Sequence, residues 1–133
     1  MKRKLVWTVL TLAILLFAVA GCTSPGGSSA YEFVGTWQTS ASGQTETVVF
    51  TTTSISVTDS GYITGTMSSS IQAVDTAAKH IKMSMSSATG IYTLYPIGTV
   101  FYMTYNVTGN TMYFSTSTSS YPSSATSGPY LKQ

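Results

Sequence analysis

Hydrophobic and polar side chains alternate along much of the chain after residue 30. The pattern is clearest over residues 45–50, 81–85 and 99–117. Because a period of two places successive side chains on opposite faces of a strand, each run has one apolar face. No later stretch keeps a helical period for long, although residues 71–79 are expected to form a helical turn or short helix. The pattern therefore predicts an all-β domain.

A Gly-Asn pair at positions 109–110 divides the last of these runs. Such a pair between two alternating segments is typical of a two-residue hairpin turn. If the residues that flank the turn pair with each other, Val107 faces Met112 and Tyr105 faces Phe114. We expect an antiparallel hairpin with one buried, apolar side and one largely polar side.

A second hairpin is expected around residues 59–61. A two-residue turn would put Val57 and Ile63 on opposite faces, whereas a three-residue loop pairs Val57 with Ile63. We therefore expect the three-residue loop, with a bulge beside it. Residues 91–97 are expected to form a further strand, and Pro96 indicates an edge or the end of that strand.

About seven or eight short strands joined mostly by tight turns suit an up-and-down barrel or a sandwich. Gly35-Thr36-Trp37 resembles the Gly-x-Trp of the first lipocalin strand, residues 105–114 resemble the late hairpin of bacterial lipocalin-like lipoproteins, and residues 130–132 resemble their last strand. The resemblance implies a small up-and-down antiparallel β-barrel. The alternative is an immunoglobulin-like β-sandwich.

The lipocalin resemblance implies a cation from the last strand over Trp37. Lipocalins place an arginine there, but no arginine follows Arg3 in this chain. Lys132 is the residue that can replace it, and its ammonium can make a cation–π contact without the planar stack of a guanidinium.

The beginning of the chain is a different kind of segment. Lys2, Arg3 and Lys4 precede an apolar run over residues 5–18. At 1.5 Å per residue this run reaches about 21 Å, which is less than the roughly 30 Å of a bilayer's hydrocarbon core. A signal peptide fits these residues better than a membrane-spanning helix.

The apolar run is followed by Val19-Ala20-Gly21-Cys22, which resembles the lipobox of bacterial lipoproteins. The resemblance implies that residues 1–21 are removed and that Cys22 carries lipid. The protein would then be anchored in the bacterial outer membrane or on the outer face of the plasma membrane. The alternative is an ordinary signal peptide with an incidental cysteine. Cys22 is the only cysteine, so it has no partner for an intramolecular disulfide.

The organisation expected after cleavage is a lipidated cysteine and flexible tether over residues 22–30, then a lipocalin-like domain over residues 31–133. The tether lacks large apolar side chains. The domain carries three lysines against four carboxylates, a formal charge of −1. Without a basic patch, no binding to nucleic acid is expected.

Residues able to perform enzyme chemistry are few. After residue 22 there are one histidine and four acidic residues. A catalytic carboxylate pair, Glu32 with Glu46 or Asp59 with Asp75, would form only if the fold happened to bring the two residues together. We expect no enzymatic activity and no cofactor.

The sequence His80-Ile81-Lys82-Met83-Ser84-Met85 contains residue types that bind copper(I). On a strand, however, Met83 and Met85 share one face while His80 points to the other. Core packing by the methionines is favoured, and no metal is expected.

The apolar face of the late hairpin can either fill the barrel or line its mouth, and filling is favoured. The leading functional hypothesis is still a barrel that binds a small hydrophobic ligand. The candidate ligand-binding residues are Trp37, Phe101, Met103, Tyr105, Met112 and Phe114. The alternative is a structural or protein-interaction module with a filled barrel, which contacts an unknown partner through tyrosines such as Tyr121 and Tyr130.

Overall fold

The structure, a computed structural model, describes residues 31–133. The predicted signal peptide, the lipidated Cys22 and the tether up to residue 30 lie outside the described residues. Among residues 31–133, no helix is long and apolar enough to cross a bilayer.

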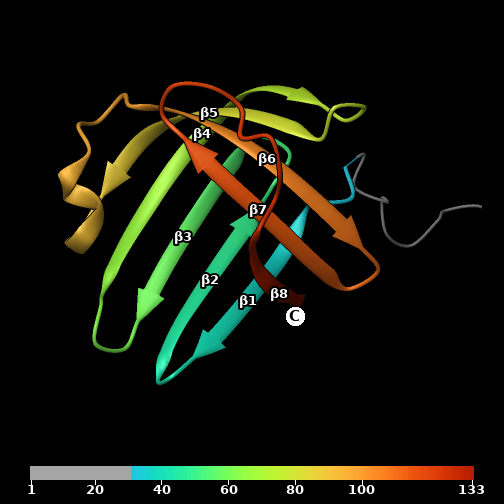
Figure 1. The fold of residues 1–133 in the computed structure, drawn as a ribbon. Helices are drawn as coiled ribbons and strands as arrows, with labels where there is room; N and C mark the ends of the chain where they lie inside the picture. The colour runs from blue at the N-terminus through green and yellow to red at the C-terminus, as the bar shows by residue number, and fades with distance from the viewer. Residues whose placement is uncertain (1–30) are drawn as a thin grey trace, which may run out of the picture.

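The described residues form a closed barrel of eight antiparallel strands (Figure 1). Each strand pairs with the next along the chain, and the last pairs with the first. The strands are β1 (Gly35–Ala41), β2 (Gln44–Phe50), β3 (Ser54–Ser60), β4 (Gly65–Asp75), β5 (His80–Ala88), β6 (Val100–Thr108), β7 (Thr111–Ser117) and β8 (Ser127–Lys132). A short 3₁₀ helix, η1 (Gly90–Leu94), follows β5. The predicted up-and-down barrel is confirmed, and the sandwich alternative is wrong.

Alternation along the strands accounts for the inside and outside of the barrel. In β5, Ile81, Met83 and Met85 are buried. The alternate residues His80 and Lys82 are only partly buried. Equivalent positions of the other strands supply the rest of the core. Because all eight strands and this core lie within residues 31–133, that segment contains what the barrel needs to fold.

The β6–β7 hairpin has the predicted register. Val107 pairs with Met112 and Tyr105 pairs with Phe114. Gly109 has a φ of 59°, which a glycine adopts without steric cost at this turn.

The predicted register of the β3–β4 hairpin is wrong. Val57 pairs with Met67 rather than Ile63, and five residues, 60–64, separate the last pair of the hairpin, Asp59 and Gly65. The Gln44 amide holds this loop from the β1–β2 turn: its Nε2 donates to the Ile63 carbonyl at 2.8 Å, and its Oε1 accepts from the Ile63 N–H at 3.0 Å. The register differs by an even number of residues, so the same side chains still face the core.

Two local predictions between residues 71 and 97 are also wrong. Residues 71–79 are not helical, because β4 continues to Asp75 and the carboxylate of Asp75 accepts hydrogen bonds from two backbone N–H groups of the following turn. Residues 91–97 do not form a strand. Gly90, with a φ of 58°, starts η1 instead, and its backbone lies against that of Thr64.

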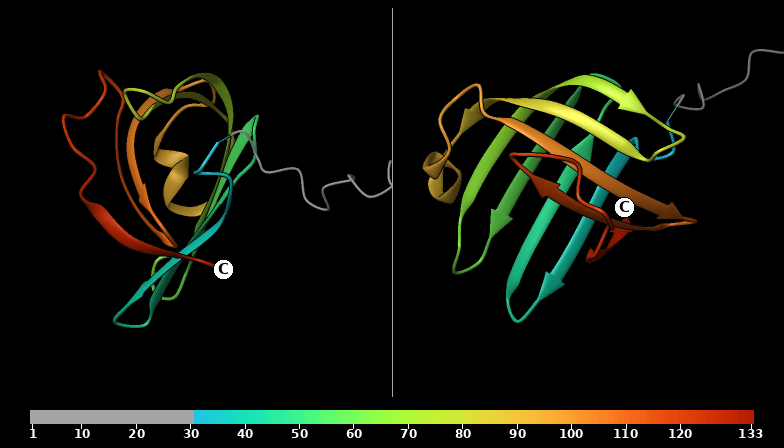
Figure 2. Two further views of the ribbon diagram at one scale, coloured as in Figure 1. Left: turned by 90° about the vertical axis from the view of Figure 1, so that its right-hand side faces the viewer. Right: turned by 45° about the horizontal axis from the view of Figure 1, so that its top comes forward.

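The two ends of the barrel differ. One end, the closed end, holds residues 31–34, here called the N-terminal segment, and the β2–β3, β4–β5 and β6–β7 turns. The other, the mouth end, holds the β1–β2 turn, the β3–β4 loop, η1 and the start of the β7–β8 loop (Figure 1). Seen from the side of the N-terminal segment, η1 lies within the outline of the strands (Figure 2, left).

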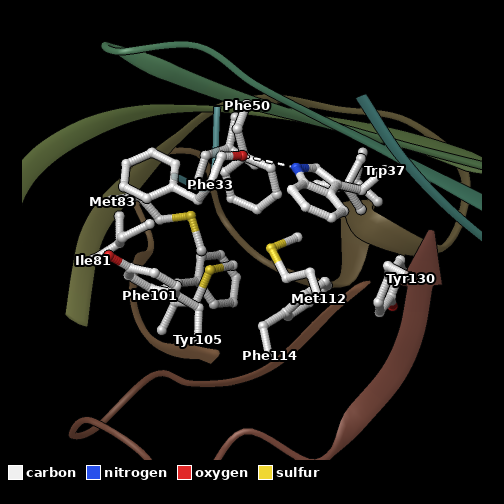
Figure 3. Close-up of a cluster of buried hydrophobic side chains, with 14 of the residues drawn as sticks. Phe33, Trp37, Phe50, Ile81, Met83, Phe101, Tyr105, Met112, Phe114 and Tyr130 are labelled. Atoms are coloured by element: carbon white, nitrogen blue, oxygen red, sulfur yellow. Dashed lines mark hydrogen bonds between the residues drawn. The ribbon is translucent and has the colours of Figure 1, made fainter. Parts of the chain in front are cut away.

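Aromatic side chains fill the closed end (Figure 3). Phe33 packs edge-on against Phe50 and Tyr105, with ring centroids 5.7 and 5.2 Å apart. The indole N–H of Trp37 donates to the Phe33 carbonyl at 2.7 Å, which fixes the N-terminal segment beneath the strands. These contacts leave no exposed surface on either Phe33 or Trp37.

The β7–β8 loop folds back over the outer face of β6. The Thr104 hydroxyl donates to the Pro122 carbonyl at 2.6 Å, and the Tyr121 ring stacks on His80 with centroids 4.0 Å apart. His80 therefore lies outside the barrel, opposite to Met83 and Met85, as the strand geometry predicted.

Candidate ligand-binding cavity

A cavity of about 210 Å³ occupies the mouth half of the barrel interior. Its apolar walls are aliphatic and thioether side chains and one aromatic ring, which point inward from six strands. They are Val48, Ile55, Val57, Met67, Met83, Met103 and Phe114. The polar part of its lining consists of Glu46, Tyr92, Thr116, Ser127 and Tyr130.

Side-chain size explains why this half is hollow. Phe33, Trp37 and Tyr105 fill the closed end, whereas valine, isoleucine and methionine line the other half. An eight-stranded barrel is just wide enough for its side chains to fill it, so smaller residues at inward positions leave space.

Glu46 lines the polar end of the cavity, and a second carboxyl group, that of Asp59, lies behind this lining. Glu46 on β2 is the direct cross-strand partner of Asp59 on β3. Both residues are in phase with buried core positions of their strands, and Asp59 is 8% exposed. The fold thus brings together two acids that sequence reasoning did not pair.

Each carboxyl group accepts a hydrogen bond from a tyrosine. The Tyr130 hydroxyl donates to Glu46 Oε1 at 2.7 Å. The Tyr92 hydroxyl, from η1, donates to Asp59 Oδ2 at 2.5 Å. The cluster Glu46, Asp59, Tyr92 and Tyr130, which we call the acid–tyrosine cluster, therefore connects three strands with η1.

Burial sets the protonation of the acid–tyrosine cluster. It raises the pKa of Glu46, and the nearby Asp59 carboxyl raises that pKa further, while the hydrogen bond from Tyr130 opposes the rise. Burial and the neighbouring carboxylates also raise the pKa values of Tyr92 and Tyr130. Both tyrosines therefore stay protonated hydrogen-bond donors at neutral pH.

The cations of the described segment are engaged elsewhere. Lys79 pairs with Glu32, Lys82 lies by the Tyr102 ring, and Lys132 lies over Trp37. His80 stacks on Tyr121. Within residues 31–133, none of these side chains is therefore placed to pair with the acid–tyrosine cluster.

The predicted ligand residues divide into two groups. Met103 and Phe114 line the cavity. Trp37, Phe101, Tyr105 and Met112 are buried in the core and lie outside the cavity lining.

Sequence reasoning missed the acid–tyrosine cluster, although part of it leaves a trace. Glu46 is in phase with Val48 and Phe50, so it occupies an inward position of a strand. Asp59 has the same relation to Ile55 and Val57. A carboxylate at an inward position is a signal for a functional site.

The tyrosines expected to contact a macromolecular partner do not project into solvent. Tyr130 is 4% exposed and bonds to Glu46, and Tyr121 is half-buried against His80 and Tyr102. Tyr130 is therefore not part of an exposed surface, and contact of this protein with a macromolecular partner stays a prediction.

Among residues 31–133, no group of three or more histidine, cysteine, aspartate and glutamate side chains is placed to hold a metal ion. Comparison with known proteins matches this chain to no protein family, no curated protein and no solved structure.

Proposed function

We propose that this protein is a lipid-anchored lipoprotein of the bacterial envelope whose barrel binds a small, largely apolar molecule without changing it chemically. The observation that carries the proposal is the cavity of about 210 Å³ with its aliphatic and thioether walls. Lipid on Cys22 would hold this binding domain at the membrane surface.

The cavity volume supports a small ligand. An apolar protein cavity of about 150 Å³ accommodates benzene, whereas drug-sized ligands need about 300 Å³ or more. A cavity of about 210 Å³ therefore suits a single ring or a short alkyl chain rather than a complete phospholipid.

The acid–tyrosine cluster supports a hydrogen-bond donor on the ligand's polar end. Glu46 and Asp59 face each other beside an apolar cavity, and the described cations lie elsewhere. An alkylammonium group would compensate negative charge on these carboxyls and donate hydrogen bonds to their oxygens. A carboxylate would instead add negative charge beside them and be repelled.

Three probes of equal length test the proposal: hexylamine, hexanol and hexanoate, titrated into residues 31–133 by calorimetry at neutral pH. We expect binding to weaken in that order. Hexanoate should bind at least about tenfold more weakly than hexylamine, because its charge has the wrong sign.

A matched pair of variants separates the cavity from the surface. Val57→Phe adds an aromatic ring at an inward position of the cavity wall, whereas Val49→Phe adds the same ring at an outward position that is 38% exposed. Val57→Phe should abolish hexylamine binding, and Val49→Phe should leave it unchanged. Equal binding by both variants, or no binding by the wild-type domain, would contradict the proposal.

A further inference from the structure

Exposed apolar side chains gather at the mouth end of the barrel. Eight large hydrophobic side chains of residues 31–133 are exposed to solvent. Six of them belong to the β3–β4 loop, to η1 and to the residues that follow η1. These six, the mouth patch, are Tyr62, Ile63, Ile91, Leu94, Tyr95 and Ile97. Leu94 is 83% exposed and Tyr62 is 71% exposed, so they project well into solvent.

The mouth patch is one surface, because its two segments are joined. The Ile91 N–H donates to the Thr64 carbonyl at 3.3 Å, and the Thr66 N–H donates to Thr89 Oγ1 at 3.0 Å. Through Tyr92 and Asp59, η1 is also bonded to the interior beside the cavity. The apolar surface therefore adjoins the polar end of the cavity.

The mouth patch is free of charge. Residues 60–64 and 89–99 contain no aspartate, glutamate, lysine, arginine or histidine. The nearest acids along the neighbouring strands, Glu46 and Asp59, face the interior. Isoleucine and leucine accompanied by tyrosine, without charge, match the acyl and interfacial layers of an uncharged lipid surface.

The chain that precedes the barrel is long enough for the mouth patch to reach the anchoring membrane. Nine residue steps separate Cys22 from Tyr31, a contour length of about 31 Å. The seven residues of β2 span about 24 Å and the eleven of β4 about 37 Å, and both span less along the barrel axis when tilted. The reach from Cys22 is therefore comparable with the distance between the closed end and the mouth end.

We propose that the mouth patch inserts into the uncharged surface of the same bilayer that holds the Cys22 lipid, and that the cavity receives its ligand from this bilayer. The lipid anchor is part of the proposed function, on which this inference rests. The mouth patch supplies the contact with the bilayer, and the anchor keeps the barrel within its reach.

Cosedimentation of residues 31–133 with phosphatidylcholine vesicles tests the inference without the anchor. The wild-type domain should bind, and raising the salt concentration should not release it, because the contact is apolar. The double variant Leu94→Ser/Ile97→Ser should bind at least about tenfold more weakly. The matched control Val49→Ser/Leu131→Ser removes two exposed apolar side chains away from the mouth end and should bind like wild type.

Two results would overturn the inference: no vesicle binding by the wild-type domain, or equal binding by both double variants. A dimer that dissociates on Leu94→Ser/Ile97→Ser substitution would also overturn it, since the mouth patch would then serve a second copy of the chain. Hexylamine titration without vesicles keeps the two proposals apart. The double variant should retain hexylamine binding. A wild-type domain that binds hexylamine but not vesicles would be a failure of this inference alone.

Discussion

Lys132 lies over the indole ring of Trp37, with its Nζ 5.3 Å from the ring centroid. The two residues are also direct partners where β8 meets β1, a seam with only two residue pairs in register. A Cβ on Gly35 would lie 2.9 Å from Lys132 Cε, and Gly35 has a φ of 143°. The Gly-x-Trp motif and the last lysine therefore form one closure of the barrel.

Removing the lysine should weaken this closure. Lys132→Ala should lower the free energy of unfolding by about 1 kcal/mol, since the cation–π contact and the packing of the alkyl chain are both lost. Lys132→Arg should retain the contact. Urea unfolding of residues 31–133 followed by the fluorescence of Trp37 measures both changes, and equal stability of the two variants would argue against a stabilising contact.

The buried carboxyl pair should make stability depend on pH. Burial raises the pKa of Glu46 above its ordinary value of 4.5, so the folded state holds this proton more tightly than the unfolded state. The contribution to stability is present below pH 4.5 and is lost as the pH rises through the folded-state pKa. Glu46→Gln should therefore make the free energy of unfolding depend less on pH above pH 4.5. It should also raise that free energy at neutral pH by up to about 1 kcal/mol, as urea unfolding at a series of pH values would measure.

The control for Glu46 is Glu32→Gln, which neutralises a carboxyl at the surface, where Glu32 pairs with Lys79. It changes the formal charge of the domain by the same amount as Glu46→Gln but removes no carboxyl from the acid–tyrosine cluster. A profile for Glu46→Gln with the wild-type slope would show that Glu46 ionises freely in the folded protein.

Two buried tyrosines should respond in opposite directions to loss of the hydroxyl. The Tyr105 hydroxyl is buried without a hydrogen-bond partner among residues 31–133, and burial raises its pKa to about 12. Tyr105→Phe should therefore be neutral or stabilising by about 1 kcal/mol, whereas Tyr130→Phe should destabilise by about 1 kcal/mol, because Glu46 loses its donor. Thermal unfolding of the two variants side by side gives both signs in one experiment.

Cys22 should be the site of lipid attachment. Cys22→Ser removes the predicted lipidation site, which lies outside the described residues, and leaves every residue of the barrel unchanged. We expect the variant, expressed in bacterial cells fed a labelled fatty acid, to incorporate none of the label and to unfold at the same urea concentration as the wild-type domain. Incorporation of the label into the variant would contradict the lipidation hypothesis.

The sequence predicts those parts of the fold that depend on neighbouring residues. The β6–β7 register follows from a Gly-Asn turn between two alternating runs. The contact of Lys132 with Trp37 joins the two ends of the domain, and it was expected only from the resemblance of residues 35–37 to a lipocalin motif. The β3–β4 loop is different, because the amide of Gln44 holds Ile63 across nineteen positions of the chain. No local turn pattern contains that contact.

The acid–tyrosine cluster was unpredictable for a similar reason. Pairing of Glu46 with Asp59 requires the register between β2 and β3, and Tyr92 reaches Asp59 only because residues 90–94 form η1 instead of a strand. The inward phase of each acid was visible in the sequence. Their proximity depends on tertiary structure.

The methionines give the barrel interior a mechanical property. Met67, Met83 and Met103 line the cavity, and Met85 and Met112 are buried in the core around it. Unbranched thioether chains change rotamer readily and are highly polarisable, so such a wall deforms around guests of differing outline. A compliant wall discriminates poorly by shape. Selection among guests should then depend on the charge and hydrogen-bonding capacity of the end that meets Glu46 and Asp59.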